Sequence, residues 1–252
     1  MTLAPTTLTR IQLCGPTAIE RGGTRLEGRL PGRQGRLLFA YLVLNRHRPI
    51  GRDELVEALW PQELPPATDA GLNALISKLR KALGAGALEG RSSLRLQFPE
   101  ACFVDVEAAP AAVHQAESRV SLGDFARAWG PAISALVVAE REFLPGEDGT
   151  WVDEQRRRLG EIRFRALEAY GAAGLGLGGT ELPAAVRAGR ELVRLAPLRE
   201  SGYRLLMQAL AGQGNAAEAL VVYAGLRDVL RDELGVSPCS ATQAVYTGLL
   251  RA

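Results

Sequence analysis

The sequence predicts a mainly α-helical protein with a small β component, divided into a front domain of residues 1–105 and a back domain of residues 106–252. Short segments that alternate apolar and polar residues, as strands do, occur near both ends of the front domain. Three amphipathic segments lie between residues 33 and 83, and from about residue 107 the pattern is wholly helical. A chain of 252 residues is long enough for two domains of ordinary size.

Strands are expected at the two ends of the front domain. Residues 8–13 alternate apolar and polar side chains, and the double-glycine turn at residues 22–23 extends them into a small antiparallel sheet. Residues 94–98 and 102–104 are two further short strands, joined at Pro99-Glu100. We interpret this second pair as a hairpin.

Three helices are expected between these strands. The first covers about residues 33–45, and the second covers about residues 52–60, where the following proline stops it. The third is capped by Thr68 or Asp69 and continues to Leu83. Strands, three helices and a hairpin follow one another in this order in a winged helix-turn-helix of the OmpR type, where the third helix reads DNA and the hairpin is the wing.

The third helix carries the clearest functional signal. At about 100° per residue one side of it is apolar and the opposite side is polar, and it holds both lysines of the chain. Amides, hydroxyls and methyl groups suit base edges in a major groove, and long cations suit phosphates. The predicted base contacts are Asn73, Ala74, Ser77 and Lys81. The predicted phosphate contacts are Lys78, Arg80, Arg52, Arg33 and Arg95. The alternative is an ordinary solvated helix face with plain surface arginines.

An internal repeat is expected in the back domain. The turn into a helix at residues 180–185 recurs at residues 214–219, 34 residues later, which is the tetratricopeptide period. A similar turn occurs at residues 123–128, and a longer helix, from about Thr150 to Ala173, separates it from the other two. We therefore expect an all-α, tetratricopeptide-like domain with small residues where its helices cross.

We interpret the tryptophans and the arginine run of the back domain as structural residues and not as parts of a binding site. Trp129 and Trp151 are expected to anchor the core of its helices. The run of arginines at residues 156–158 could bind nucleic acid. We favour a solvated face of the long helix, paired with Asp153, Glu154 and Glu161.

Composition and motifs argue against several classes of protein. No run approaches about 18 apolar residues, so no membrane-spanning helix is expected. The three cysteines lack a CxxC spacing, which favours reduced thiols in a cytoplasm and no metal site. The only histidines, His47 and His114, lie near no catalytic motif, and no Gly-Lys dipeptide of a phosphate-binding loop occurs. We expect no enzyme and no cofactor, and a cytoplasmic, nucleoid-associated protein.

Stretches of both domains resemble the Streptomyces antibiotic regulatory protein (SARP) family. Residues 35–45 and 53–60 are similar to the first two helices of its DNA-binding domain, and residues 72–83 are similar to its recognition helix. The stretches that resemble its bacterial transcriptional activation domain are residues 144–153, 203–210, 217–223 and 234–238.

The resemblance implies a transcriptional activator whose expected partner is double-stranded promoter DNA. Such proteins bind direct repeats in promoters, usually as two protomers side by side, and contact RNA polymerase and its sigma factor. Control of secondary-metabolite genes is the implied role. The alternative, from a different class, is a tetratricopeptide-like protein-interaction scaffold whose winged helix does not bind DNA.

Overall fold

The computed structural model describes residues 8–98 and 101–251, which form two compact units. The first unit contains the chain up to Ala108 together with Arg141–Leu159, and the second contains Ala109–Glu140 and the chain from Gly160 onward. The boundary that we expect from the sequence, between residues 105 and 106, lies close to the first crossing between these units. Our prediction did not include the return of residues 141–159 to the first unit.

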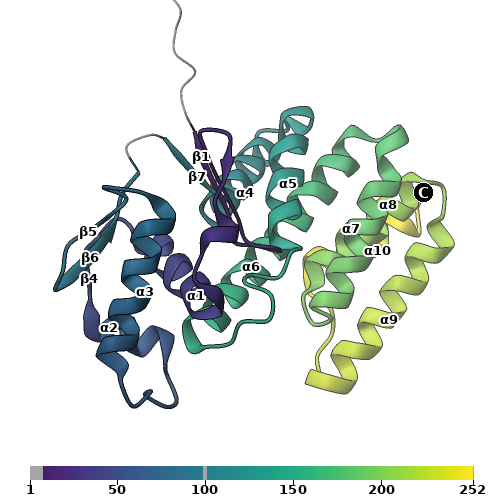
Figure 1. The fold of residues 1–252 in the computed structure, drawn as a ribbon. Coiled ribbons are helices and arrows are strands. Elements are labelled where there is room, and N and C mark those ends of the chain that lie inside the picture. The colour runs from purple at the N-terminus through teal and green to yellow at the C-terminus, as the bar shows by residue number, and fades with distance from the viewer. Residues whose placement is uncertain (1–7, 99–100, 252) are drawn as a thin grey trace, which may run out of the picture. The chain divides into compact units, whose positions relative to one another are not determined.

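Three helices form the centre of the first unit (Figure 1): α1 (Gly32–Leu44), α2 (Arg52–Leu59) and α3 (Thr68–Leu83). Their bounds agree closely with the helices predicted from periodicity. The fully buried side chains Leu38, Leu55 and Leu72, one from each helix, belong to a common apolar core. Leucines at helical spacing therefore determine which face of each helix is buried.

A four-stranded sheet contains the first strands of the chain in the order β3-β2-β1-β7. Its strands are β1 (Thr9–Gln12), β2 (Ala18–Arg21), β3 (Thr24–Arg25) and β7 (Cys102–Val104). Strand β7 lies parallel to β1, with Thr9 opposite Cys102 and Ile11 opposite Val104. The predicted hairpin between residues 94–98 and 102–104 is therefore wrong. Its proposed turn at Pro99-Glu100 lies outside the described residues.

The wing is formed by a different pair of strands. β5 (Leu88–Glu89) and β6 (Ser93–Leu96) are antiparallel, and β6 also pairs with β4 (Ile50–Gly51). Gly90 makes the turn between β5 and β6 with φ +91°, where an added Cβ would lie 1.9 Å from the carbonyl oxygen of Ser93. Only glycine fits this position without distortion. The alternation of Leu88, Leu94 and Leu96 around this glycine is the signal that our sequence prediction missed.

The segment at residues 141–159 is part of the first unit. Gly15 donates a backbone hydrogen bond to Glu142, and Leu144 donates one to Leu13. Helix α6 (Thr150–Leu177) begins here, and its Trp151 meets Tyr41 of α1 edge-on, with 5.2 Å between ring centroids. The indole nitrogen of Trp151 donates to the carbonyl oxygen of Ala58 at 3.0 Å. Our assignment of Trp151 to the core of the helical domain is therefore wrong.

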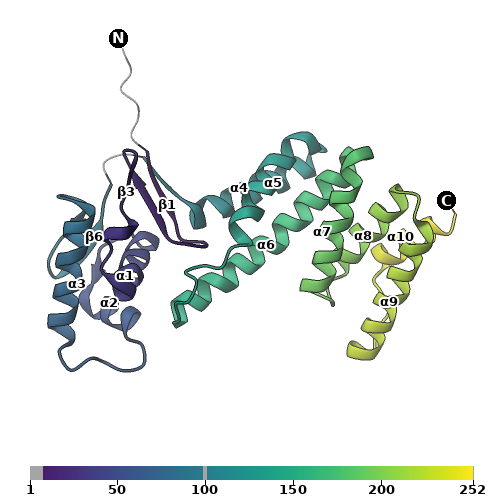
Figure 2. The same ribbon diagram turned by 45° about the vertical axis from the view of Figure 1, so that its right-hand side comes forward.

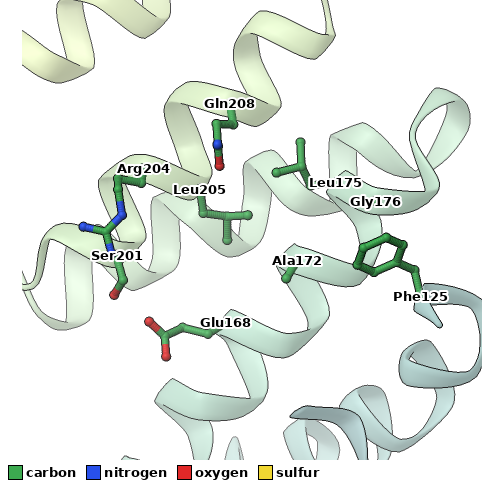
Figure 3. Close-up of a pocket in the computed structure, with 9 residues that line it drawn as sticks. All are labelled: Phe125, Glu168, Ala172, Leu175, Gly176, Ser201, Arg204, Leu205 and Gln208. Carbon is green, nitrogen blue, oxygen red and sulfur yellow. The ribbon is translucent and has the colours of Figure 1, made fainter. Parts of the chain in front are cut away.

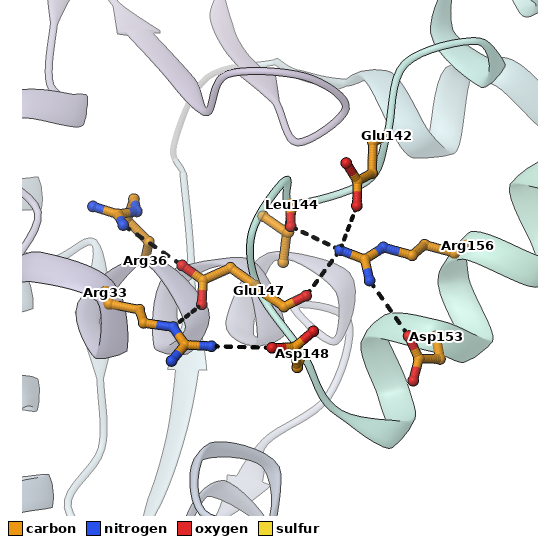
Figure 4. Close-up of polar contacts among 8 residues, drawn as sticks. All are labelled: Arg33, Arg36, Glu142, Leu144, Glu147, Asp148, Asp153 and Arg156. Atoms are coloured by element: carbon orange, nitrogen blue, oxygen red, sulfur yellow. Dashed lines mark hydrogen bonds and ion pairs between the residues drawn. The ribbon is translucent and has the colours of Figure 1, made fainter.

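Arg156 holds the loop that precedes α6 (Figure 4). Its guanidinium donates to the carbonyl oxygens of Leu144 and Glu147, which Figure 4 draws, at 3.1 and 2.8 Å. It also donates to the carbonyl oxygen of Phe143 at 3.1 Å. Arg156 is therefore half-buried and not on a solvated face as predicted, although its predicted pair with Asp153 forms at 3.4 Å. The neighbouring Arg157 and Arg158 do follow the prediction, because both pair with Glu154.

The second unit contains six further helices within the described part of the chain. They are α4 (Asp105–Ser121, from Ala109 onward), α5 (Phe125–Ala139), α7 (Leu182–Leu195), α8 (Glu200–Gly212), α9 (Ala216–Leu234) and α10 (Ser240–Leu249). A short 3₁₀ turn, η2 (Gly179–Glu181), precedes α7. Figure 2 shows α7, α8 and α9 packed in succession. None of the helices that the structure describes is long and apolar enough to cross a membrane.

Small residues allow the helices of the second unit to approach closely, as the sequence predicts. A Cβ on Gly176 of α6 would lie 2.3 Å from the ring of Phe125 at the start of α5. A Cβ on Gly189 of α7 would lie 2.9 Å from the Cα of Leu206 in α8. Trp129 packs on Tyr170 within this unit, with 4.5 Å between ring centroids, in agreement with its expected core position.

Candidate nucleic-acid interface

Helix α3 exposes one polar face of the first unit. Leu72, Ile76, Leu79 and Leu83 are buried on its other side. The exposed residues of the helix include Asn73, Ala74, Ser77, Lys78 and Lys81, as the helical periodicity predicts. The two basic residues in its last turn, Arg80 and Lys81, suit the negative end of the helix dipole. The helix ends at Gly84, which has φ +89°.

The predicted cap of α3 does not form. Ala67 occupies the N-cap position, and no side chain makes a capping hydrogen bond there. The hydroxyl of Thr68 instead donates to the carbonyl oxygen of Pro65 at 2.7 Å and so fixes the loop that leads into the helix. This hydrogen bond ties the first residue of α3 to the loop that follows α2.

Asn73 and Arg52 are brought together by the structure. Arg52 is the first residue of α2, and its Nη2 donates to Oδ1 of Asn73 at 2.8 Å. Its Nη1 lies 3.4 Å from the carbonyl oxygen of Arg91 in the turn of the wing. Arg52 thus links the start of α2 with the exposed face of α3 and with the wing.

Lys78 and Lys81 border a hollow of about 430 Å³ together with Arg29, Pro31 and Ala82. Arg29 belongs to the short 3₁₀ helix η1 (Glu27–Arg29), which precedes α1. In the described part of the chain, no hydrogen-bond acceptor or carboxylate engages any of the three cations. Three cations around one hollow form a site suited to an anion such as a phosphodiester. The prediction from the sequence missed Arg29, because residues 26–31 have no periodicity that places this side chain beside α3.

Arg80 and Arg95 are placed at the wing. Arg80 donates from Nε to the carbonyl oxygen of Leu88 at 3.2 Å, and it also donates to the carbonyl oxygen of Gly90. Its guanidinium therefore ties α3 to strand β5 and to the turn that follows it. Arg95 lies exposed on strand β6, opposite Glu89 of β5.

Arg33 lies apart from this group and contacts acidic residues (Figure 4). Its Nε is 2.6 Å from Oε2 of Glu147, a side chain that is only 5% exposed, and Asp148 is 3.7 Å away. Arg36 approaches the same Glu147 carboxylate at 3.5 Å. The hydrogen bond with Glu147 raises the pKa of the Arg33 guanidinium above its ordinary value. A residue held in this way has little freedom to reach a phosphate.

Replacing Arg33 with alanine separates its two possible roles. A phosphate contact, as predicted from the sequence, would reduce the salt dependence of DNA binding by about one unit of log K against log salt. The ion pair with Glu147 leads us to expect an unchanged slope and a lower unfolding temperature, because the buried carboxylate loses its nearest cation. Salt titrations and thermal unfolding of the variant measure both quantities.

A second candidate site lies in the helical unit (Figure 3). A hollow of about 370 Å³ lies between α6 and α8. Its lining combines apolar side chains with a few polar ones: Phe125, Glu168, Ala172, Leu175, Gly176, Ser201, Arg204, Leu205 and Gln208. Arg204 is partly engaged, since it donates to the hydroxyl of Thr242 at 3.1 Å. A partly apolar hollow of this kind suits a segment of a partner protein.

Two protein-family models match the chain. A model described as bacterial transcriptional activator domain covers residues 104–250. A model described as transcriptional regulatory protein, C terminal, covers residues 27–92. The first includes residues 141–159, which pack with the winged helix, so the family domain and the compact unit do not have the same bounds.

The chain is similar to regulatory proteins of Streptomyces and Mycobacterium species. The chain is 35% identical to regulatory protein AfsR of Streptomyces coelicolor over 96% of its own length and 24% of that protein. It is 30% identical to transcriptional regulatory protein EmbR of Mycobacterium tuberculosis, covering 95% of this chain and 62% of EmbR. Regulatory protein DnrI of Streptomyces peucetius is 24% identical, with 96% of this chain and 92% of DnrI covered. The chain thus spans about a quarter of AfsR, and less than two thirds of EmbR.

A solved structure of Mycobacterium tuberculosis EmbR, in complex with a low-affinity phosphopeptide, has a similar fold. The TM-score is 0.80 at 25% sequence identity, and the likeness covers 96% of this chain and 65% of the EmbR chain. The likeness supports an OmpR-type winged helix followed by a helical domain in one chain.

Proposed function

This chain belongs to the Streptomyces antibiotic regulatory protein family of transcriptional activators, and we propose that it recognises promoter DNA through the exposed face of α3. Its family and its relatives are transcriptional regulators and not enzymes. DNA recognition needs one surface that combines base-reading groups with cations for the backbone. The face of α3 and its surroundings offer both.

The single observation that supports this proposal most strongly is the grouping of exposed polar side chains on α3. Asn73, Ala74 and Ser77 lie in the first half of the helix and are assigned to base edges. Lys78 and Lys81, together with Arg29, are assigned to the DNA backbone. Lys81 lies about one helical turn after Ser77 on the exposed face, so it is also assigned to a base edge.

The remaining cations have different roles in this proposal. Arg95 on the wing strand β6 is a further backbone contact. Arg80 acts mainly by holding the wing, because two of its N–H groups are engaged with the main chain. Arg33 acts mainly on Glu147.

The promoter architecture and the partner proteins in this proposal are those that the family resemblance implies. We propose that two protomers bind direct repeats side by side and contact RNA polymerase and its sigma factor. The regulated genes in this proposal are those of secondary metabolism.

The salt dependence of DNA binding tests the proposal. A duplex is selected from a random-sequence library with the unchanged chain, and its affinity is measured over a range of salt concentrations. Four backbone cations predict that log K falls with a slope of roughly −4 against log salt, at about 0.9 per phosphate. Failure to select any sequence, or a flat response with weak binding, contradicts DNA recognition.

A protein-interaction scaffold is the second candidate, and the hollow between α6 and α8 favours it. This alternative predicts that the same chain does not enrich any duplex. It also predicts that substitutions lining the hollow, such as Leu205→Ala, change the binding of a partner protein while Lys78→Ala has no effect. Enrichment of one DNA sequence by the full chain argues against a winged helix that has lost DNA binding.

A further inference from the structure

The contact between Arg52 and Asn73 has a consequence for base recognition if α3 reads DNA, as proposed above. Asn73 is exposed on α3, and its Oδ1 accepts a hydrogen bond of 2.8 Å from Nη2 of Arg52. A guanidinium has only donors, so the amide oxygen of Asn73 must face it. The bond is charge-assisted and therefore stronger than a neutral one.

The orientation of the amide determines what Asn73 offers to a base. With Oδ1 held by Arg52, the Nδ2 group is left with its two N–H donors free for a ligand. An asparagine that reads adenine needs both groups, because Nδ2 donates to N7 while Oδ1 accepts from the N6 amino group. Oδ1 keeps a second lone pair, but the positive charge of Arg52 beside it opposes an amino group at that place and favours an acceptor such as O6 of guanine.

We propose that Arg52 is a positioning residue that sets base specificity: it fixes the Asn73 amide as a hydrogen-bond donor and makes the pair select guanine over adenine in the major groove. This assignment replaces the phosphate contact expected for Arg52 from the sequence. It also revises the expectation that Asn73 reads adenine bidentately. The second bond of Arg52, at 3.4 Å to the carbonyl oxygen of Arg91, also ties the guanidinium to the wing turn.

Loss of Arg52 releases the amide. In Arg52→Ala the Asn73 side chain is free to turn about its last bond, so that both faces of the amide become available and adenine is accepted. A backbone contact has a different signature, since phosphate contacts carry no sequence information and their loss weakens all duplexes alike.

The test compares sequence selection by variants of the full chain. The unchanged chain, Arg52→Ala, Arg52→Lys, Asn73→Ala and Arg95→Ala each select duplexes from the same random library, and affinities are then measured for duplexes with every base at each position. We expect the unchanged chain to prefer guanine over adenine at one position by roughly tenfold, which corresponds to one good base contact. Arg52→Ala should reduce this ratio to about one at that position only.

The other variants separate this role from structural damage. Arg52→Lys keeps a positive donor at this place and should retain part of the discrimination. Asn73→Ala should lose discrimination at the same position. A double variant that combines Arg52→Ala with Asn73→Ala should show no larger loss there than Asn73→Ala alone. Arg95→Ala, which removes a cation that does not touch Asn73, should weaken all sequences equally. Unfolding temperatures identify any variant that is merely unstable.

Three results overturn the inference, and each can be distinguished from the others. If the unchanged chain selects a sequence and Arg52→Ala selects the same sequence with uniformly lower affinity, Arg52 is a backbone contact and DNA recognition stands. If Arg52→Ala changes neither the selected sequence nor the affinity, the contact with Asn73 has no role in recognition. If the unchanged chain selects nothing, the proposed function fails and this inference fails with it.

Discussion

Replacing Trp151 with alanine is expected to destabilise the winged-helix unit by about 2–4 kcal/mol, somewhat less than the roughly 3–5 kcal/mol lost when a core tryptophan is truncated, because Trp151 is only half-buried. Trp151 contacts Tyr41 edge-on and lies near Phe143, whose ring is fully buried. Its indole N–H also donates to the carbonyl oxygen of Ala58 at the end of α2. The variant loses these contacts and leaves the Ala58 carbonyl without that partner.

Hydrogen exchange measured by mass spectrometry localises the effect. Amides of α1 and α2 should exchange faster in Trp151→Ala, while those of α7 and α8 keep their protection. Trp129→Ala is the matched control, because it removes a tryptophan that packs on Tyr170 in the helical unit. It should produce the opposite pattern. Unchanged exchange in α1 and α2 of Trp151→Ala would contradict the inclusion of residues 141–159 in the first unit.

The second large effect is expected for DNA binding. Lys78→Ala combined with Lys81→Ala removes two of the three cations around the hollow beside Arg29. At about 0.9 per phosphate, the slope of log K against log salt should become less negative by about 1.8. If the affinity at about 1 M salt is unchanged, this is roughly a sixtyfold loss of affinity at 0.1 M salt. Filter binding or fluorescence anisotropy on the selected duplex measures both the slope and the affinity.

A variant with the same change in net charge serves as the control. Arg157→Ala combined with Arg158→Ala also removes two cations from the first unit, but both pair with Glu154 and neither lines the hollow beside Arg29. Its salt slope should equal that of the unchanged chain. Equal losses for the two double variants would show that net charge, and not the site around Arg29, governs binding.

The helices could be predicted from the sequence because the residues that specify each helix lie within it or next to it. Leucines at a spacing of three and four residues define the buried faces of α1 and α3, and prolines mark where helices stop. The length of α6, which we expected from about Thr150, follows from the same periodicity. The polar face of α3 is the part of the candidate site that this local pattern gives directly.

The pairing of the strands could not be predicted from the sequence in the same way. β1 and β7 are short, and their parallel pairing joins residues such as Thr9 and Cys102, which lie far apart in the chain. No local pattern specifies such a pair, so the strand at residues 102–104 was assigned to its nearest neighbour in sequence. The wing was missed for a related reason, since β5 contains only two residues, Leu88 and Glu89.

Contacts between side chains that are far apart in the sequence were the hardest to predict. Arg33 and Glu147 are separated by 114 positions, and both belong to segments that look like ordinary charged surface. The convergence of Arg29 with Lys78 depends on how η1 packs beside α3, which no spacing in the sequence records. Trp151 was placed in the wrong unit because it lies well past the domain boundary that we expect at residue 106. No local pattern shows that Arg156 holds the loop before it through three carbonyl groups of the first unit.

The central claim, that the exposed face of α3 enters the major groove, can be tested by DNA cleavage from a tethered iron chelate. The chelate is attached at Ser77→Cys in a chain whose Cys102 and Cys239 are replaced by serine. Cys14 can remain, because it is fully buried and burial raises the pKa of its thiol to about 12. We expect cuts confined to a few adjacent base pairs for each bound protomer within the selected sequence. Bound DNA that shows no localised cleavage from position 77 would contradict the account.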